Sequence, residues 1–305
     1  MSLLQAIIIG IVQGLTEFIP ISSTAHLIFA SKALNLFGGA GAELQAQQTT
    51  ATIAVVQLGT LLAVLIYFAP DILTITVAFI RDHLAILSGG GTRPRESRAA
   101  SGAVVGRRSR LSDDARLGWL VIIGSIPVGV VGLLFKEQIE GTFTKNLWVI
   151  ATMMIVIALL LAVAEKVGTQ RREMAQLGLR DALAVGFAQV LALIPGSSRS
   201  GSTIMGGLFA GEKRETAARF SFLLSIPAVA ASGLLELKKA VHILPQGSTL
   251  PLIVATVTAG LVGYASIWFL LRYLRTHSTF VFIAYRLVLG ATLFALLWLG
   301  YVRPV

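Results

Sequence analysis

Residues 17–27 read EFIPISSTAHL and interrupt a run that is otherwise apolar. Within this stretch, Ser22 or Ser23 is placed to cap a helix that begins here. His26 follows three or four residues later, so a serine hydroxyl and the imidazole can face the same point. A general base beside a hydroxyl is the arrangement that activates a nucleophile, and Glu17 adds a carboxylate close by.

A second polar stretch, PGSSRSGST at residues 195–203, has the composition of an anion site. Gly196 permits close approach of the backbone, and Arg199 supplies a planar cation. Free N–H groups at the start of a helix also bind phosphate groups. The hydroxyl groups that would add to them belong to Ser197, Ser198, Ser200 and Thr203. The stretch therefore predicts a cradle for phosphate.

Each of these features also has a structural explanation. Serine and threonine after proline are ordinary helix caps, and a histidine is often a packed, hydrogen-bonded residue. Glu17 and Arg199 are harder to explain in this way, because a charge at the centre of a bilayer costs about 3 kcal/mol. A structural ion pair between them is the alternative. Gln57, in VVQLGTLL, predicts an interhelical hydrogen bond, and Arg286 either snorkels or supports the site.

The elements that position these residues belong to a membrane protein. Of the 305 residues, 55% are hydrophobic and 13% are charged, whereas about 25% of the residues of an average soluble domain are charged. The chain has no cysteine, which excludes disulfides and thiolate metal sites. Six stretches are long and apolar enough to span a bilayer: residues 51–69, 117–135, 147–164, 220–235, 250–271 and 279–302.

The net charge of +10 does not indicate a nucleic-acid partner, because the basic residues follow the membrane topology. Most of them lie in four segments on one predicted face: residues 81–116, 166–180, 213–219 and 272–275. By the positive-inside rule this face is cytoplasmic. Residues 88–114 are rich in glycine, serine and arginine, and they predict a flexible cytoplasmic loop.

Two further apolar stretches, residues 3–35 and 181–210, are broken at Pro20 and Pro195. Each half is too short to cross a bilayer, so each stretch predicts a re-entrant hairpin that enters and leaves on one side. The two stretches also match each other, GIVQ…FIPISST against GFAQ…LIPGSSR. The matched pairs are Gly10 with Gly186, Gln13 with Gln189, Pro20 with Pro195, Ser22 with Ser197, and Ser23 with Ser198, which sets Thr24 opposite Arg199.

Three spans follow each hairpin, so the hairpins enter from opposite faces and the chain forms two inverted repeats, residues 1–165 and 178–305. In membrane proteins of this kind, broken helices meet near the midplane and form the binding site there. The predicted fold is all-α and polytopic, with six transmembrane helices plus two re-entrant helical hairpins arranged as inverted repeats.

An anion cradle, a nucleophile and a base at lipid depth together predict phosphoryl transfer on a membrane-dissolved phosphate ester. The motifs QGLTEFIPISSTAHL, PGSSRSGSTI, ARFSFLLSIPA and VVQLGTLLAV resemble those of bacterial undecaprenyl-diphosphate phosphatases associated with bacitracin resistance, and the resemblance covers essentially the whole chain. It implies removal of the terminal phosphate from undecaprenyl diphosphate, which regenerates the carrier lipid for envelope polymers. It also implies a plasma-membrane location, a site open to the outer face, and a divalent cation, Mg²⁺ or Ca²⁺, as cofactor.

The family's acidic motif falls on Gln13 and Glu17 of this chain. Gln13 is an amide, so it can position substrate or water but cannot act as a base or as an anionic metal ligand. The resemblance implies that Glu17 either binds the metal ion or orients the imidazole of His26. It implies that Arg199 binds the phosphoryl oxygens and stabilises the charge spread over them in the transition state.

The resemblance assigns the nucleophile to Ser23, or else to Ser22, and the acceptance of its proton to His26. Direct attack by water, with the serine only as a hydrogen-bond donor, is equally compatible with the sequence. The residues expected to contact substrate are Gln13, Ser22, Thr24, Gly196, Ser197, Ser198, Ser200 and Thr203.

Two other classes of protein are open to the same sequence. A transporter of lipid phosphates or small anions uses the same inverted-repeat architecture, but it needs no nucleophile with a base. A structural membrane scaffold leaves Glu17 and Arg199 unexplained. The expected partners are an isoprenyl diphosphate lipid and the bilayer, with no nucleic acid and with room for a homodimer.

Overall fold

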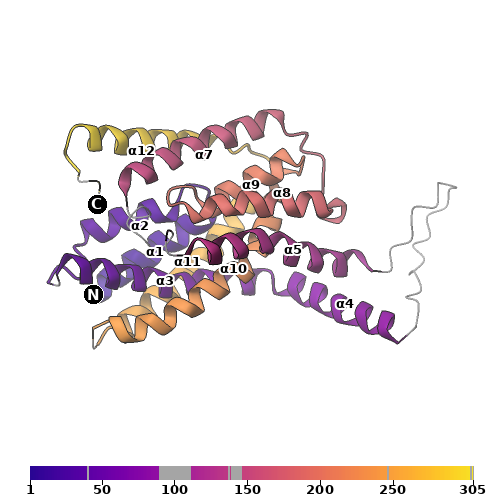
Figure 1. Ribbon diagram of the computed structural model, residues 1–305, viewed down its shortest axis with the longest axis horizontal. Coiled ribbons are helices and arrows are strands. Elements are labelled where there is room, and N and C mark those ends of the chain that lie inside the picture. The colour runs from indigo at the N-terminus through magenta and orange to yellow at the C-terminus, as the bar shows by residue number, and fades with distance from the viewer. Residues whose placement is uncertain are drawn as a thin grey trace.

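The computed structural model describes residues 1–39, 41–88, 111–136, 138, 146–245, 247–302 and 304. Within these ranges the regular elements are helices, apart from one isolated bridge between Arg172 and Glu212. The helices form an elongated bundle with both termini at one end (Figure 1). Most of the loop predicted at residues 88–114 lies outside the described residues.

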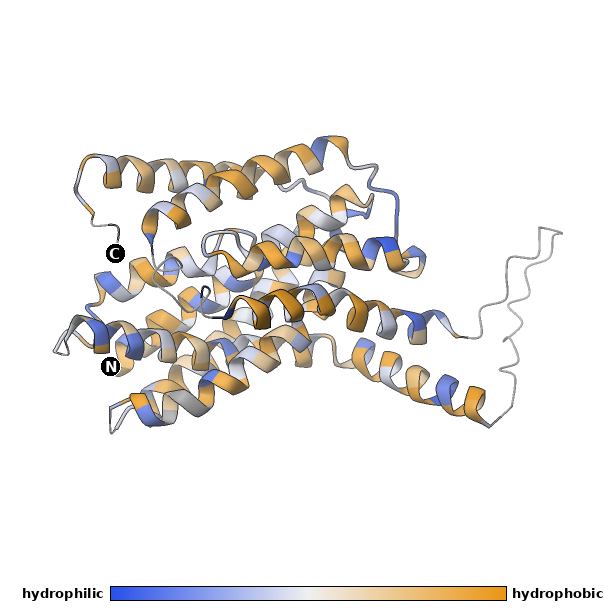
Figure 2. Cartoon of the chain, in the orientation of Figure 1, coloured by the Kyte–Doolittle hydropathy of each residue, from blue (hydrophilic) through white to orange (hydrophobic). Residues whose placement is uncertain are grey.

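Six of the described helices are long and apolar enough to cross a membrane, as the sequence predicts. They are apolar along most of their length (Figure 2). Each corresponds to one predicted span, and the chain is a multi-pass, all-α membrane protein. Their bounds are α3 Ala42–Tyr67, α5 Asp113–Leu134, α7 Leu147–Val167, α10 Arg214–Ile243, α11 Thr249–Leu274 and α12 Phe280–Trp298.

A further helix, α4 Ala69–Leu87, was not expected from the sequence. Its C-terminal end, from Arg81, belongs to the basic segment 81–116 that the sequence places on the cytoplasmic face. Asp82 is buried on the side of α4 that faces α5, where its carboxylate accepts the backbone N–H of Ser112 at 2.7 Å. Hydrogen bonds from Ser112 lower the pKa of Asp82. Asp82 therefore ties the end of α4 to the start of α5.

Both predicted breaks are present. The first separates α1 Leu3–Phe18 from α2 Ser23–Ala33, and the second separates α8 Leu179–Val190 and the 3₁₀ turn η3 Leu191–Leu193 from α9 Arg199–Phe209. A second 3₁₀ turn, η2 Met174–Gln176, precedes α8. In Figure 1 the α1–α2 pair lies toward the end of the bundle that holds both termini, and the α8–α9 pair lies toward the other end. Their re-entry into a bilayer stays a prediction.

The structure aligns the two breaks one residue away from the alignment that the sequence match gave. Ser22 precedes α2 with φ +77°, and Ser198 precedes α9 with φ +65°. These two residues are therefore equivalent in the backbone, and Ser23 corresponds to Arg199 as the first residue of the second half-helix. The sequence match had set Thr24 opposite Arg199. The register shifts because three residues separate Pro195 from α9, whereas two separate Pro20 from α2.

The helices pack across the two halves of the chain. α1 lies on α11 and α8 lies on α5, while α3 pairs with α10 and α7 pairs with α12. Glycines permit close approach in the first two pairs: a Cβ on Gly10 would lie 2.5 Å from the carbonyl oxygen of Ala255, and one on Gly186 would lie 2.3 Å from that of Gly124. This exchange of partners supports a two-fold relation, although the repeats themselves stay a prediction.

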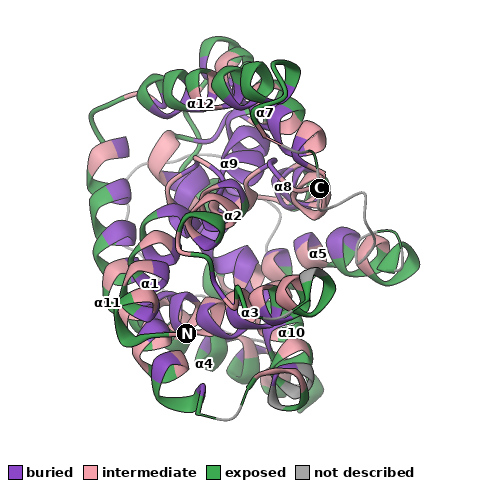
Figure 3. Ribbon diagram, turned by 90° about the vertical axis from the view of Figure 1, so that its left-hand side faces the viewer, coloured by how far each residue is buried: buried purple, intermediate pink, exposed green. Residues whose placement is uncertain are grey.

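The most enclosed element is α9, whose residues from Ser200 to Leu208 are all buried. In the end-on view α9 lies inside the bundle, while α7, α11 and α12 present exposed faces around it (Figure 3). A short helix with so many small and hydroxyl-bearing residues is too polar for lipid, so its neighbours must cover it. The fold thus holds the start of α9, with Arg199, inside protein.

Candidate active site

Glu17 and Arg199 join the two breaks directly. Glu17 is buried at the end of α1, and its Oε1 accepts a hydrogen bond from Arg199 Nη2 at 2.5 Å. Gln57 Nε2 of α3 donates to the same oxygen at 3.2 Å, and Gln13 Nε2 donates to Oε2 at 3.0 Å. The predicted interhelical bond of Gln57 is therefore confirmed, and the ion pair considered as the structural alternative is formed.

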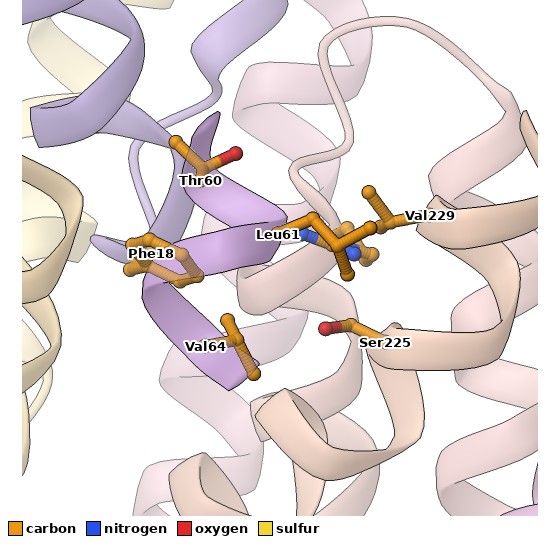
Figure 4. A pocket seen from close by; sticks show the side chains of 7 residues that line it. Phe18, Thr60, Leu61, Val64, Ser225 and Val229 are labelled. Atoms are coloured by element: carbon orange, nitrogen blue, oxygen red, sulfur yellow. The ribbon is translucent and has the colours of Figure 1, made fainter. Parts of the chain in front are cut away.

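Arg199 has a second nitrogen, Nη1, that is buried without a hydrogen-bond partner. Its side chain borders a narrow crevice between α1, α3 and α10. Phe18, Thr60 and Leu61 line one side, and Ser225 and Val229 line the other (Figure 4). The space is too tight for water, so the walls must separate before a phosphate group reaches the guanidinium from this side.

Arg286, in α12, supports the site. Its guanidinium is completely buried and donates to five carbonyl groups. Two belong to α7: Nε donates to Met154 at 3.2 Å and Nη2 to Met153 at 3.3 Å. The other three belong to the breaks, with Pro20 at 3.4 Å and Gly196 and Ser197 each at 3.0 Å. Arg286 therefore fastens both breaks to one wall of the bundle.

The expected pairing of His26 with Ser23 is wrong in this structure. His26 Nδ1 lies 2.7 Å from the carbonyl oxygen of Ser22, and Nε2 lies 2.6 Å from the hydroxyl of Tyr285 in α12. Both ring nitrogens are thus engaged by other groups. The backbone carbonyl one turn earlier takes the position that the side chain of Ser23 was expected to fill.

Glu17 does not orient the imidazole either, because its partners are Arg199, Gln13 and Gln57. Tyr285 takes that place and was missed in the sequence. The signal that could have found it is its position: a phenol beside Arg286 within the last apolar span.

The hydroxyl groups of the two breaks divide into free and engaged ones. Those of Ser22 and Ser197 are buried and have no partner. Ser22 stands at the start of α2, yet its hydroxyl makes no cap, contrary to the expectation. Ser198 does cap α9, because its Oγ accepts the N–H of Gly201 at 3.1 Å, and it also lies 3.2 Å from Ser200 Oγ.

Three other expected substrate contacts have different places. The hydroxyl of Thr203 is already engaged, because it lies 2.7 Å from the carbonyl oxygen of Arg199 and 2.5 Å from Ser221 Oγ in α10. Thr24 is exposed in the first turn of α2. Gly196 has φ +90°, and a Cβ there would lie 2.3 Å from the carbonyl of Ile150, so only glycine fits this turn.

The donors for a divalent cation are few but chemically suitable. The described residues contain no group of three or more His, Cys, Asp or Glu side chains that could hold a metal alone. Gln13 Oε1, however, is buried without a partner beside Glu17. Mg²⁺ and Ca²⁺ prefer oxygen ligands, and Mg²⁺ is often held by one or two carboxylates together with the phosphates of a substrate. The residues present fit an ion shared with substrate.

Residues 6–292 match the family model of the bacitracin resistance protein BacA. The chain belongs to the BacA family. Similar proteins named undecaprenyl-diphosphatase include that of Syntrophobacter fumaroxidans, 49% identical over 99% of this chain and 98% of that protein. The protein of Mycolicibacterium smegmatis is 48% identical over 98% of each chain, and that of Chlorobaculum tepidum is 46% identical over 100% of each. The BacA match includes both breaks and Arg286.

We predict that Arg286→Lys destabilises the protein strongly. An ammonium has three donors on a flexible stem, so it cannot serve five carbonyls that a planar guanidinium reaches together. Each hydrogen bond to a charged group contributes about 1.5–3 kcal/mol, so the loss of two costs about 3 kcal/mol or more. Thermal unfolding in detergent measures this.

The matched control is Arg272→Lys, at the end of α11, where the guanidinium lies 5.8 Å from the ring of Trp268 outside the site. Its unfolding temperature should stay close to that of the unchanged protein. An Arg286→Lys variant that unfolds at the same temperature as this control would show that the five contacts are not needed to hold the breaks.

Proposed function

We propose that this chain is an undecaprenyl-diphosphate phosphatase. It hydrolyses undecaprenyl diphosphate to undecaprenyl phosphate and inorganic phosphate, which recycles the lipid carrier for cell-wall synthesis and confers resistance to bacitracin. The names of its relatives give the substrate. The observation that carries the proposal is the meeting of two broken helices at Arg199, which keeps one buried nitrogen without a partner inside a membrane bundle.

Arg199 binds the phosphoryl group in this proposal. Its free Nη1 and its planar fork suit two oxygens of a phosphate, and its positive charge stabilises the charge spread over them in the transition state. The hydroxyls of Ser22 and Ser197 are buried without partners, so they can donate hydrogen bonds to the same phosphoryl group. The cradle expected from the sequence therefore contains Arg199, Ser197 and Ser22, but not Thr203.

The nucleophile is Ser23 or a water molecule. Ser23 is the first residue of α2, as Arg199 is of α9, so the two side chains leave equivalent points of the two breaks. Either hydroxyl must lose a proton as it attacks phosphorus, and His26 is the base that receives it. The electron pair of the cleaved bond leaves with undecaprenyl phosphate. Where Ser23 is the nucleophile, water then attacks the phosphoserine and releases inorganic phosphate, and the serine hydroxyl is restored.

A divalent cation, Mg²⁺ or Ca²⁺, would be held by Glu17 and by Oε1 of Gln13, with the diphosphate completing its ligands. When bound, it would neutralise part of the charge on the diphosphate. Because Gln13 is neutral, the site carries one negative charge fewer than a site with two carboxylates. This weaker repulsion favours entry of an anionic head group.

The assay that tests the function is phosphate release from a C55 or C15 isoprenyl diphosphate by the purified protein in detergent, with Mg²⁺, with Ca²⁺ and with chelator. We expect steady release with a divalent cation and little without it. Absence of release under all three conditions, together with uptake of a lipid phosphate or small anion into vesicles, would favour the transporter instead.

We predict that Arg199→Lys folds but loses most of kcat/KM. The ammonium keeps the charge but is a point donor, whereas the fork gives two parallel hydrogen bonds to phosphate oxygens. A loss of about 2 kcal/mol in transition-state stabilisation corresponds to about thirtyfold in kcat/KM. The measurement is phosphate release alongside thermal stability.

The control for this variant is Arg219→Lys in α10. Arg219 lies away from the breaks, and its Nη2 is 3.0 Å from Oδ2 of Asp71. It should keep nearly full kcat/KM. If Arg199→Lys keeps its activity as well, Arg199 serves only as the ion-pair partner of Glu17.

The proposal places the protein in the bacterial plasma membrane, with the basic end of the bundle in the cytoplasm and the site open to the outer face. Cysteines introduced at Gly41, before α3, and at Ser88, after α4, should then label from opposite sides. An impermeant maleimide should label Gly41→Cys in intact cells, and Ser88→Cys only after permeabilisation. Labelling of both in intact cells would contradict the orientation.

A further inference from the structure

Both ring nitrogens of His26 are hydrogen-bonded, and the two partners define its tautomer. The carbonyl oxygen of Ser22, 2.7 Å from Nδ1, can only accept, so Nδ1 carries a hydrogen. In the neutral ring Nε2 is then the bare nitrogen, and the hydroxyl of Tyr285, 2.6 Å away, donates to it. The basic atom of His26 is therefore Nε2, and it faces Tyr285.

This arrangement restricts how His26 can act as a base. No nitrogen of the ring is left for Ser23 or for a water molecule. A proton can reach Nε2 only through the hydroxyl of Tyr285, or after the bond to Tyr285 has broken. The first route leaves the ring in its observed place, and the second requires one of the two side chains to move.

The structure favours the first route. Ser22, at the Nδ1 side, is 1% exposed, whereas Tyr285, at the Nε2 side, is 44% exposed and is the accessible member of the pair. The two rings are nearly parallel, with 12° between their planes and 5.6 Å between their centroids. Tyr285 also precedes Arg286, whose contacts with both breaks fix this turn of α12 beside the site.

We propose that Tyr285 is the proton carrier between His26 and the reacting oxygen, a role that rests on the phosphatase function proposed above. As the hydroxyl of Ser23 or of water bonds to the terminal phosphorus, its proton passes to the phenol oxygen. The phenol's own proton passes to Nε2 and makes an imidazolium. The bond from phosphorus to the bridging oxygen breaks, and its electron pair stays with the lipid phosphate.

The test is a double-mutant cycle on phosphate release from an isoprenyl diphosphate. Tyr285→Phe removes the hydroxyl and keeps the ring, and we expect kcat to fall about 10²-fold, the scale of general acid–base catalysis. KM should stay within about threefold, because the change affects the transition state rather than binding. His26→Ala should lose a similar factor, and the double variant should be no slower than either single one.

Tyr264→Phe is the matched control, since Tyr264 is 45% exposed in α11 and its ring packs against Tyr67. It should keep full kcat, and thermal unfolding of Tyr285→Phe should resemble that of this control. Full or increased kcat in Tyr285→Phe would overturn the proposal, because breaking the bond would then free His26. Multiplying losses in the double variant would overturn it too. No phosphate release by the unmodified protein would instead defeat the phosphatase function, and the carrier role with it.

Discussion

One buried guanidinium makes the two broken helices compatible with a membrane interior. Each break leaves backbone carbonyls without intrahelical partners, and no water is available at bilayer depth to satisfy them. Arg286 supplies donors to Pro20 at one break and to Gly196 and Ser197 at the other. Its own charge is satisfied by the same contacts, so the cost of burying an arginine and the cost of breaking two helices offset each other. The positions of the flanking residues depend on this one side chain.

The two breaks that Arg286 holds share the same backbone strain. Ser22 and Ser198 both adopt positive φ, an arrangement that costs non-glycine residues about 1–3 kcal/mol and persists only where the surroundings enforce it. The following residue in each case is the first of a half-helix, Ser23 in one and Arg199 in the other. The same backbone conformation therefore occurs at both breaks. It precedes the hydroxyl of Ser23 in one half of the chain and the guanidinium of Arg199 in the other.

The sequence predicts the six spans and both breaks because hydropathy, helix length and proline act locally. It fails where the decisive partner is distant or is a backbone atom. Helix α4 was not expected, and the contact between Asp82 near its end and Ser112 joins residues 30 positions apart. The spacing of Ser23 and His26 is right for contact, but it cannot reveal that a carbonyl and the phenol of Tyr285, from a helix 259 residues away, occupy the ring first.

The ion pair between Glu17 and Arg199 supplies the counter-charge that a phosphoryl group would bring in the proposed reaction. A guanidinium left alone at this depth would lack a counter-charge, and Glu17 provides one through the same kind of oxygen that a phosphate would offer. An arriving phosphoryl group must therefore share or replace the contact of Glu17 with Arg199. In the proposed reaction, the amides of Gln13 and Gln57 are the remaining partners that hold the carboxylate of Glu17 in place.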